Sequence, residues 1–277
     1  MNPRKNPNLG VSQVRAKKRR LLKIRLTIIF GVLFFVIIGL ALLSGIDKTK
    51  ISNIKISGNI AVGRQEIEDI VNTDLSGRYF YLFSKRNSLI FPRFFIEKDL
   101  ANTIKRFEGV NVEWSDLNTI TITVKERKPF SLWCGNNLLK TEDCYFMDET
   151  GYIFGVAPIF SGNAFVKNFG GISSNSPIGE NFLNPLTYLE LNKFIDSISG
   201  LGFRSGTLFY NGDDFSLVLE NGIEIKFSDK IGFQSAFDNL SSAINANQID
   251  LALGSEKIKY VDLRFGDKVL VGKNLSK

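Results

Sequence analysis

The sequence predicts an α+β protein in which one N-terminal transmembrane helix precedes a large folded region of strands and helices. Three observations lead to this prediction. Leu26–Leu43 is an uncharged apolar run. Several later segments alternate apolar and polar residues as half-buried strands do, and four others repeat apolar residues at helical spacing. The hydrophobic content of 44% is enough to bury a core outside the membrane.

The net charge of +7 comes from the first residues of the chain. No acid precedes Asp47, whereas nine bases do, which leaves 26 of the 35 basic residues to face all 28 acidic ones. Those nine bases are Arg4, Lys5, Arg15, Lys17, Lys18, Arg19, Arg20, Lys23 and Arg25. The folded region is therefore close to neutral and lacks the basic face of a nucleic-acid-binding protein. We expect no nucleic-acid partner.

Residues 26–46 are predicted to cross the membrane. The 18 residues Leu26–Leu43 span about 27 Å as a helix, close to the thickness of the hydrocarbon core. A cleaved signal peptide is the alternative, but its apolar region is usually about 7–15 residues long and ends at an A-x-A-like site. The basic residues 1–25 predict a cytoplasmic tail, with the rest of the chain outside the cytoplasm. Lys17–Arg20 would then contact anionic lipids.

Residues 51–128 predict a β-α-α-β-β module with both helices on one face of a small sheet. The predicted elements are the strand Ile51–Ser57, the helices Gly63–Asn72 and Ile96–Phe107, and a hairpin formed by the strands Val110–Trp114 and Ile120–Val124. An aromatic and basic segment, Gly77–Arg93, separates the two helices. We expect its rings to pack between them.

Residues 129–277 predict a β-rich domain of mostly antiparallel strands with two helices. Asn184-Pro185 is typical of a helix start, and Asn221-Gly222 of a tight hairpin turn. The predicted helices are Asn184–Ile198 and Ile231–Ile249; the predicted strands are Phe130–Trp133, Tyr145–Asp148, Tyr152–Val156, Thr207–Tyr210, Phe215–Leu219, Ile223–Phe227, Ile258–Phe265 and Val269–Val271.

Cys134 and Cys144 are the two cysteines of the chain. They lie on adjacent predicted strands, so a disulfide forms if the strands pair in an oxidising compartment. The alternative is two buried thiols that never meet. Two cysteines are too few for a zinc site built of thiolates.

The residues that catalysis usually needs are missing from the sequence. The chain has no histidine, the commonest general base and metal ligand. It also lacks a phosphate-binding glycine loop, a nucleophile elbow and any metal-ligand spacing. The paired acids Asp213-Asp214 and Glu142-Asp143 lie in predicted turns, where solvated carboxylates are ordinary. We expect no catalytic residue, no cofactor and no metal.

Several motifs, in order, resemble the FtsQ/DivIB family of bacterial cell-division proteins. Ile54–Asn59 is similar to the family's first POTRA strand and its Gly-Asn turn, and Val124–Pro129 to its V-x-E-R-x-P junction. Asp148–Phe154 is similar to its D-x-x-G-x-x-F hairpin, and Asp262–Arg264 to its D-L-R strand. The segment Gly77–Arg93 is longer and more aromatic than the family pattern.

The resemblance implies a non-enzymatic, single-pass scaffold of the divisome in the inner membrane, located at the septum. A POTRA-type module at residues 51–128 would recruit other divisome components. The β domain at residues 129–277 would bind FtsB/FtsL-type partners.

Val269, Leu270 and Val271 form a candidate edge strand, to which a partner strand would add by backbone hydrogen bonds. Tyr260, Arg264 and Phe265 on the preceding strand would supply side-chain anchors. The residue patterns leave alternatives open. Phe265 and Val269 would instead be core residues, and Arg264 a structural ion-pair residue.

Two other functions compete with the scaffold. One is a membrane-anchored extracytoplasmic enzyme that acts on the cell wall. The other is a POTRA-bearing translocation component for outer-membrane proteins, which requires a C-terminal membrane barrel of many amphipathic strands. The two helices predicted after residue 130 do not fit such a barrel of strands.

Overall fold

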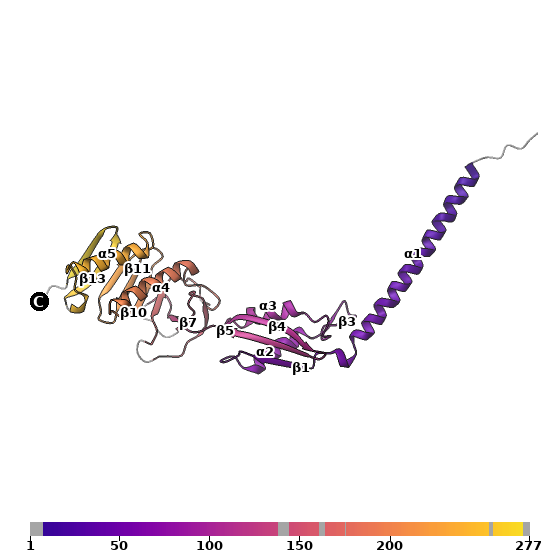
Figure 1. Cartoon of the computed structure of the whole chain (residues 1–277), viewed down its shortest axis with the longest axis horizontal. Helices are drawn as coiled ribbons and strands as arrows, with labels where there is room; N and C mark the ends of the chain where they lie inside the picture. Colours follow the sequence, from indigo (N-terminus) through magenta and orange to yellow (C-terminus); the bar gives the residue numbers. More distant parts are fainter. Residues whose placement is uncertain (1–7, 138–143, 161–163, 175, 255–256, 274–277) are drawn as a thin grey trace, which may run out of the picture. The chain divides into compact units, whose positions relative to one another are not determined.

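The computed structural model describes residues 8–137, 144–160, 164–174, 176–254 and 257–273. It has the expected α+β composition, with one N-terminal apolar helix and a large, mostly sheet region (Figure 1). The chain divides into two compact parts. Unit 1 comprises residues 1–103 and 109–125, and unit 2 comprises residues 104–108 and 126–277.

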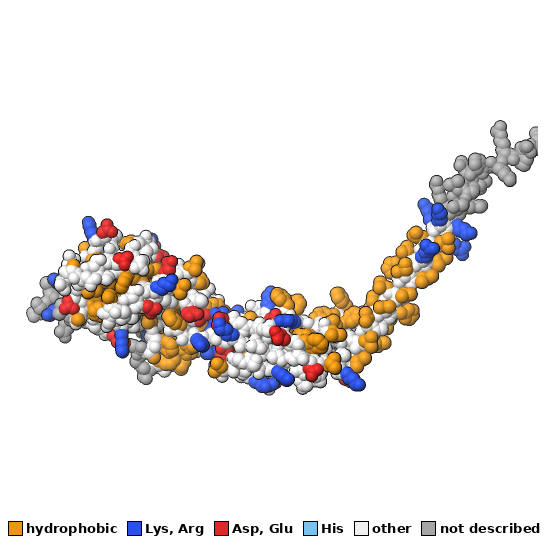
Figure 2. Space-filling model, viewed as in Figure 1, with side chains coloured by type: hydrophobic (Ala, Val, Ile, Leu, Met, Phe, Trp, Pro, Cys, Tyr) orange, Lys and Arg blue, Asp and Glu red, His pale blue; other side chains and the backbone are white. Residues whose placement is uncertain are grey.

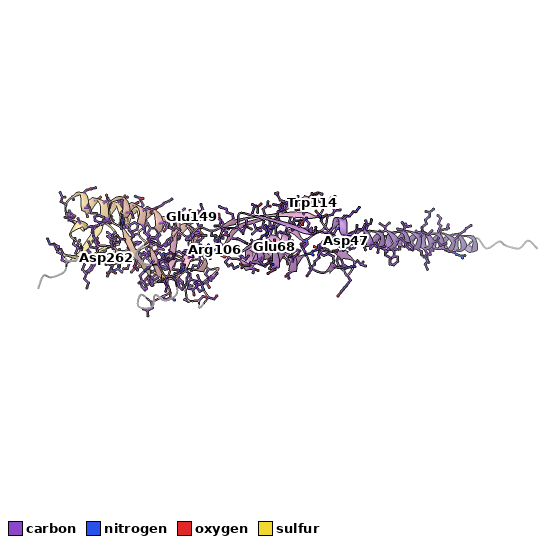
Figure 3. The ribbon with its side chains drawn as sticks, turned by 90° about the horizontal axis from the view of Figure 1, so that it is seen from below. Asp47, Glu68, Arg106, Trp114, Glu149 and Asp262 are labelled. Carbon is purple, nitrogen blue, oxygen red and sulfur yellow. A yellow bond between two sulfur atoms is a disulfide. The ribbon has the colours of Figure 1, made fainter. Side chains whose placement is uncertain are left out.

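Unit 1 begins with α1 (Asn8–Ser44), followed by the short 3-10 helix η1 (Asp47–Thr49). Within α1, Lys17–Ser44 is long and apolar enough to cross a membrane, and it is the only such helix among the described residues. Its apolar side chains are exposed, among them Phe35 at 74% and Leu42 at 73%. A core helix of a soluble protein would bury these side chains. Asp47, labelled in Figure 3, comes just after the end of α1.

The folded part of unit 1 has a three-stranded sheet in the order β1-β5-β4. Its elements are β1 (Asn53–Ser57), α2 (Arg64–Asp74), α3 (Arg93–Thr103), β4 (Phe107–Asp116) and β5 (Thr119–Glu126). β1 runs parallel to β5, with Ile54 opposite Ile120 and Ile56 opposite Ile122. The helices bury Ile67, Val71, Ile96 and Leu100 completely. These five elements follow each other in the predicted order, but a short hairpin that was not predicted lies between the two helices.

The second predicted helix of this module, Ile96–Phe107, was too long. α3 ends at Thr103, a turn follows in which Phe107 N–H donates to Ile104 O at 3.0 Å, and Phe107 begins β4. Ile104 and Phe107 are both buried, at 6% and 3% exposure. The helical spacing of these residues therefore reflected their burial and not a continuous helix.

The aromatic segment between α2 and α3 forms a hairpin of β2 (Arg78–Tyr79) and β3 (Phe83–Ser84). The expectation that its rings pack between the helices was wrong for the two at the tip. Phe80 is 87% exposed and Tyr81 is 94% exposed. Tyr79 and Phe83, at the paired positions, are half-buried.

Unit 2 contains a nine-stranded sheet in the order β14-β13-β12-β11-β10-β9-β6-β7-β8. Its strands are β6 (Ser131–Trp133), β7 (Tyr145–Met147), β8 (Ile153–Val156), β9 (Lys167–Gly170), β10 (Ser205–Tyr210), β11 (Phe215–Leu219), β12 (Glu224–Phe227), β13 (Ile258–Phe265) and β14 (Lys268–Lys273). Five neighbouring pairs are antiparallel, as expected for most of the sheet, and three are parallel. The interior strand β9 was not predicted.

The helices α4 (Pro185–Gly200) and α5 (Phe233–Asn245) pack beside each other against the sheet of unit 2 (Figure 1). As predicted, Asn184 caps α4: its side-chain oxygen accepts from Leu186 N–H at 3.0 Å. The predicted helix Ile231–Ile249 was too long at both ends, because Gly232 has φ +85° and the chain leaves the helix after Asn245. The short helix η2 (Leu251–Leu253) follows.

Candidate functional site

β14 is one edge of the nine-stranded sheet, with β13 as its single neighbour among the described strands. Val261 lies opposite Val271, and Asp262 lies opposite Leu270. A strand with one neighbour leaves the backbone N–H and C=O groups of its other side without sheet partners. Lys268–Lys273 thus presents six residues of strand to a partner.

The opposite edge of the sheet, β8, is partly covered by a following loop. Ile153 N–H donates to Glu180 O at 2.9 Å, and Gly179 N–H donates to Ile153 O at 2.8 Å. Tyr152 and Asn181 form an isolated bridge at the same place. These contacts satisfy backbone groups that a partner strand would need, so β14 is the more accessible edge.

The side chains of β14 divide between the two faces of the sheet. Val269 and Val271 pack against the core that α4 and α5 cover. The interpretation of Val269 as a core residue is therefore favoured, although it is only partly buried. Leu270, on the other face, is 46% exposed, and Phe265 at the end of β13 is 53% exposed. The core alternative for Phe265 was wrong.

Tyr260 lies flat on the face of the sheet opposite the helices. It pairs with Gly272, and a Cβ atom added to that glycine would lie 2.2 Å from Tyr260 Cε1. Lys226 Nζ lies 4.7 Å from the centre of the tyrosine ring. The ring is thus held between a glycine backbone and a cation, and it offers a rigid apolar surface beside β14.

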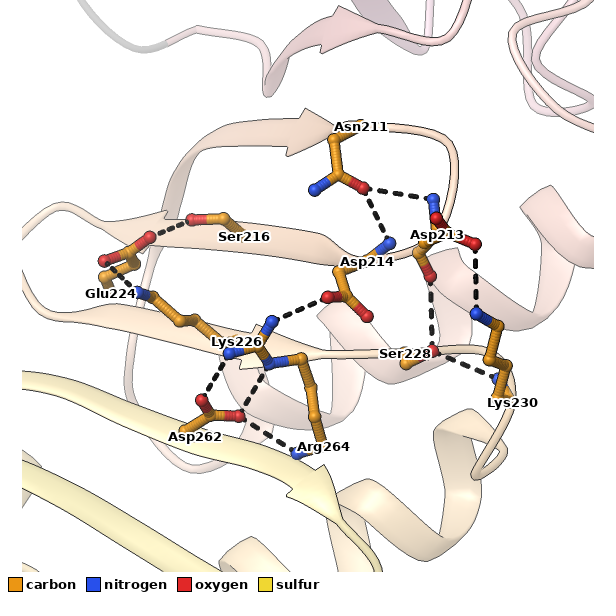
Figure 4. A network of polar contacts seen from close by, with 10 residues as sticks. All are labelled: Asn211, Asp213, Asp214, Ser216, Glu224, Lys226, Ser228, Lys230, Asp262 and Arg264. Atoms are coloured by element: carbon orange, nitrogen blue, oxygen red, sulfur yellow. Dashed lines mark hydrogen bonds and ion pairs between the residues drawn. The ribbon is translucent and has the colours of Figure 1, made fainter.

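Arg264 is bound by two carboxylates, Asp262 on its own strand and Asp214 just before β11 (Figure 4). Its Nε and Nη2 donate to Asp262 Oδ1 and Oδ2 at 2.9 and 2.6 Å, and its Nη1 donates to Asp214 Oδ2 at 2.6 Å. Burial raises the pKa of Asp262, but the hydrogen bonds and charge of Arg264 outweigh it and hold the pKa below its ordinary value. The alternative of a structural ion-pair residue therefore describes Arg264 in the free protein.

The paired acids Asp213-Asp214 serve this same network. Asn211 Oδ1 accepts from their N–H groups at 3.0 and 2.8 Å, and Asp213 pairs with Lys230 at 3.0 Å. Each acid pairs with a different cation, Asp213 with Lys230 and Asp214 with Arg264. Glu142-Asp143 lies outside the described residues.

Cys134 and Cys144 are joined by a disulfide in the structure. Cys134 directly follows β6 and Cys144 directly precedes β7, and these strands pair antiparallel. The bond therefore closes the end of a strand pair. Nearby, Arg106, labelled in Figure 3, lies over the ring of Phe154 at 5.2 Å.

No protein-family model and no curated protein matches this sequence. Among the described residues, no three Asp, Glu or Cys side chains gather as a metal site would require.

The predicted site residues lie together on β13 and β14: Tyr260, Arg264, Phe265 and the strand Val269–Val271. The carboxylates that hold Arg264 were not predicted. Asp262 was detectable, because residues two apart on a strand share a face. Asp214 was not, since it lies 50 positions away.

Proposed function

We propose that this chain is a membrane-anchored, non-enzymatic scaffold that binds an extended segment of a partner protein at β14. The observation that carries this proposal is the free edge of Lys268–Lys273 in a sheet whose other edge is partly covered. A partner strand gains affinity from backbone hydrogen bonds and specificity from its alternate side chains.

The side chains around β14 indicate the chemistry of that partner. Leu270 and Phe265 offer exposed apolar surface, and Tyr260 extends it. Lys268 and Lys273 stand at the two ends of the strand. The best fit is an extended segment with apolar residues at alternate positions and acidic residues toward its ends.

The anchoring half of the proposal rests on α1. Its exposed apolar surface and the nine bases near its start support a helix that crosses the membrane with the N-terminus in the cytoplasm. Both units then act outside the cytoplasm, where a disulfide such as Cys134–Cys144 persists.

The motifs resembling FtsQ/DivIB support a more specific version of the proposal. The chain would be a divisome scaffold at the septum of the inner membrane. FtsB/FtsL-type proteins would supply the strand that adds to β14, and unit 1, as a POTRA-like module, would contact other divisome components.

Proline scanning of β14 tests the strand-addition step. Neighbouring N–H groups of a strand point to opposite sides, so one of Leu270 and Val271 directs its N–H outward and the other toward β13. Leu270→Pro and Val271→Pro are made separately, with Val271→Thr as the control that keeps the N–H. We expect one proline variant to stay folded and to lose co-purification of the partner. Partner recovery equal to wild type in both folded variants would refute strand addition.

Imaging of a fluorescent fusion in dividing cells, with depletion of the chain, tests the divisome assignment. Midcell fluorescence and filamentous cells after depletion are expected. A uniform envelope signal with normal division would contradict it. A zymogram on purified cell wall tests the competing enzyme hypothesis, and a clearing band would favour the enzyme.

A further inference from the structure

The β2–β3 hairpin has a tip that folding alone does not explain. Leu82 N–H donates to Tyr79 O at 3.0 Å, which closes a turn with Phe80 and Tyr81 at its centre. These residues have φ values of +49° and +62°. Positive φ at both central positions is the feature of a type I′ turn, in which Asn-Gly is strongly preferred. Two aromatic residues are unfavourable there, because their Cβ atoms crowd the backbone.

The two aromatic side chains at the centre of this turn gain almost nothing from packing in the free protein. Tyr81 and Phe80 are the most exposed aromatic residues of unit 1, at 94% and 87%. Leu82 is 43% exposed. Large apolar side chains held outward in a strained turn indicate a contact that the isolated chain does not make.

The base of the hairpin is attached to the last residue of α1. Ser84 N–H donates to Ser44 Oγ at 3.3 Å, and Asn87 Nδ2 donates to Ser44 O at 3.2 Å. Both Ser44 and Asn87 are buried, at 7% and 5% exposure. Figure 1 shows β3 beside the C-terminal end of α1. The hairpin is therefore fixed at the point where α1 would leave the membrane.

A second set of bonds makes this attachment firm. Ile51 N–H donates to Arg86 O at 2.8 Å, and Ser88 N–H donates to Thr49 O at 2.9 Å. Asn87 Nδ2 also donates to Thr49 Oγ1 at 3.0 Å. The linker after α1 and the segment that follows β3 are thus hydrogen-bonded to each other, which keeps the hairpin close to the end of α1.

The composition around the hairpin matches the interface of a membrane. Tyr81 lies three residues from Ser84, so at about 3.3 Å per residue the tip is within about 10 Å of the attachment point. Residues 77–93 contain four bases and no acid. Leu89 and Ile90, just after Asn87, are also exposed, at 74% and 41%. Aromatic rings and bases are the side chains enriched at the headgroup level.

Figure 2 shows hydrophobic side chains continuing from α1 onto the adjoining part of unit 1. A surface continuous with a membrane-spanning helix and rimmed by bases fits lipid better than a separate protein. We infer that the β2–β3 hairpin is a second membrane contact, whose tip residues Phe80, Tyr81 and Leu82 enter the outer leaflet while Arg78 and Lys85 meet lipid phosphates. This inference rests on the proposed anchoring by α1 and goes beyond partner binding.

Site-specific fluorescence in the full chain tests the inference. The native cysteines are bonded to each other, so Tyr81→Cys provides the one free thiol for a nitrobenzoxadiazole label. The labelled chain is reconstituted into phosphatidylcholine–phosphatidylglycerol vesicles that contain nitroxide lipids. Ile60→Cys is the matched control, because Ile60 is 90% exposed in unit 1 but lies beyond the far end of β1. Phe35→Cys, within α1, reports on the anchor itself.

We expect the lipid nitroxides to quench the fluorescence of the labels at 81 and 35, and aqueous iodide to leave it unchanged. The label at 60 should be quenched by iodide and not by the lipid nitroxides. Adding Phe80→Asn to Tyr81→Cys should weaken lipid quenching without loss of the folded unit. Quenching at 35 combined with iodide access at 81 equal to that at 60 would overturn the hairpin contact alone. Iodide access at 35 would overturn the anchoring and the hairpin contact with it.

Discussion

Replacing the two tip residues by the preferred pair, Phe80→Asn with Tyr81→Gly, should stabilise the β2–β3 hairpin. Each L-residue in the left-handed region costs about 1–2 kcal/mol, and both residues have positive φ. Glycine offsets about 0.5–1 kcal/mol of the relieved strain, because it loses more conformational freedom on folding than other residues do. Since 87% and 94% of the two side chains are exposed, almost no packing is lost. The relief at position 80 is partial, because asparagine is itself an L-residue that only adopts this region more readily, so the net expectation is about 1–2 kcal/mol.

Hydrogen exchange of the hairpin amides measures this gain. Leu82 and Lys85 donate N–H groups to Tyr79 O and Gly77 O at 3.0 and 3.2 Å, so their exchange reports opening of the turn. A gain of 1–2 kcal/mol slows exchange by a factor of about 5–30. Leu82→Asn is the control, since it removes an apolar side chain without relieving positive φ. Exchange in the double variant as fast as in wild type would refute the reasoning.

Three further changes test unit 2. Asp148→Ala should lower the free energy of unfolding by about 3 kcal/mol, because it removes the buried partner of the Arg127 guanidinium. Urea unfolding measures this loss of stability. A loss of stability no larger than that caused by replacing an exposed acid would contradict the prediction. Asp262 has a lowered pKa, so its stabilisation is present above about pH 4 and is lost as pH falls further. Asp262→Asn should therefore flatten the pH dependence of unfolding in acid, and an unchanged slope would count against the Arg264 pairing. Reduction of the Cys134–Cys144 disulfide should lower the free energy of unfolding by about 2–3 kcal/mol. A lower urea midpoint in the presence of dithiothreitol would show this loss, and an unchanged midpoint would refute it.

The parts of the fold that the sequence predicts well are those with local signals. Phe215–Leu219 and Ile258–Phe265 were predicted with the bounds that the structure gives. Burial alternates along Phe215–Leu219, and apolar and polar residues alternate along Val261–Phe265. The first strand precedes Asn221-Gly222, where Gly222 has φ +84°. Strand alternation and turn chemistry are encoded within a few residues, so no tertiary information is needed.

The parts that the sequence did not predict depend on distant pairing. β9 has four residues, and three of them, Asn168, Phe169 and Gly170, are buried without alternation. It becomes a strand because β10 and β6 supply partners on both sides. The β2–β3 hairpin was not predicted, for a different reason. Its turn carries two aromatic residues where turn chemistry calls for Asn and Gly, so its local sequence disagrees with its structure.

The candidate site was predicted in the same uneven way. The strand Val269–Val271 and its neighbour followed from alternation and the Gly266-Asp267 turn, whereas edge position depends on the whole sheet order. The ion pair of Arg264 with Asp214 joins β13 to the turn before β11, and β13 and β11 are not neighbours in the sheet. No local pattern could reveal it.

The free edge of β14 is selective as well as open. A six-residue edge with an exposed Leu270 would invite a second copy of the chain to pair with it. In an antiparallel pair of two such strands, Lys268 of each copy would face Lys273 of the other, and in a parallel in-register pair each lysine would face itself. Like charges directly opposite destabilise a strand pair. The same lysines would attract a segment with acidic ends, so one pair of charges both discourages self-association and favours the proposed partner.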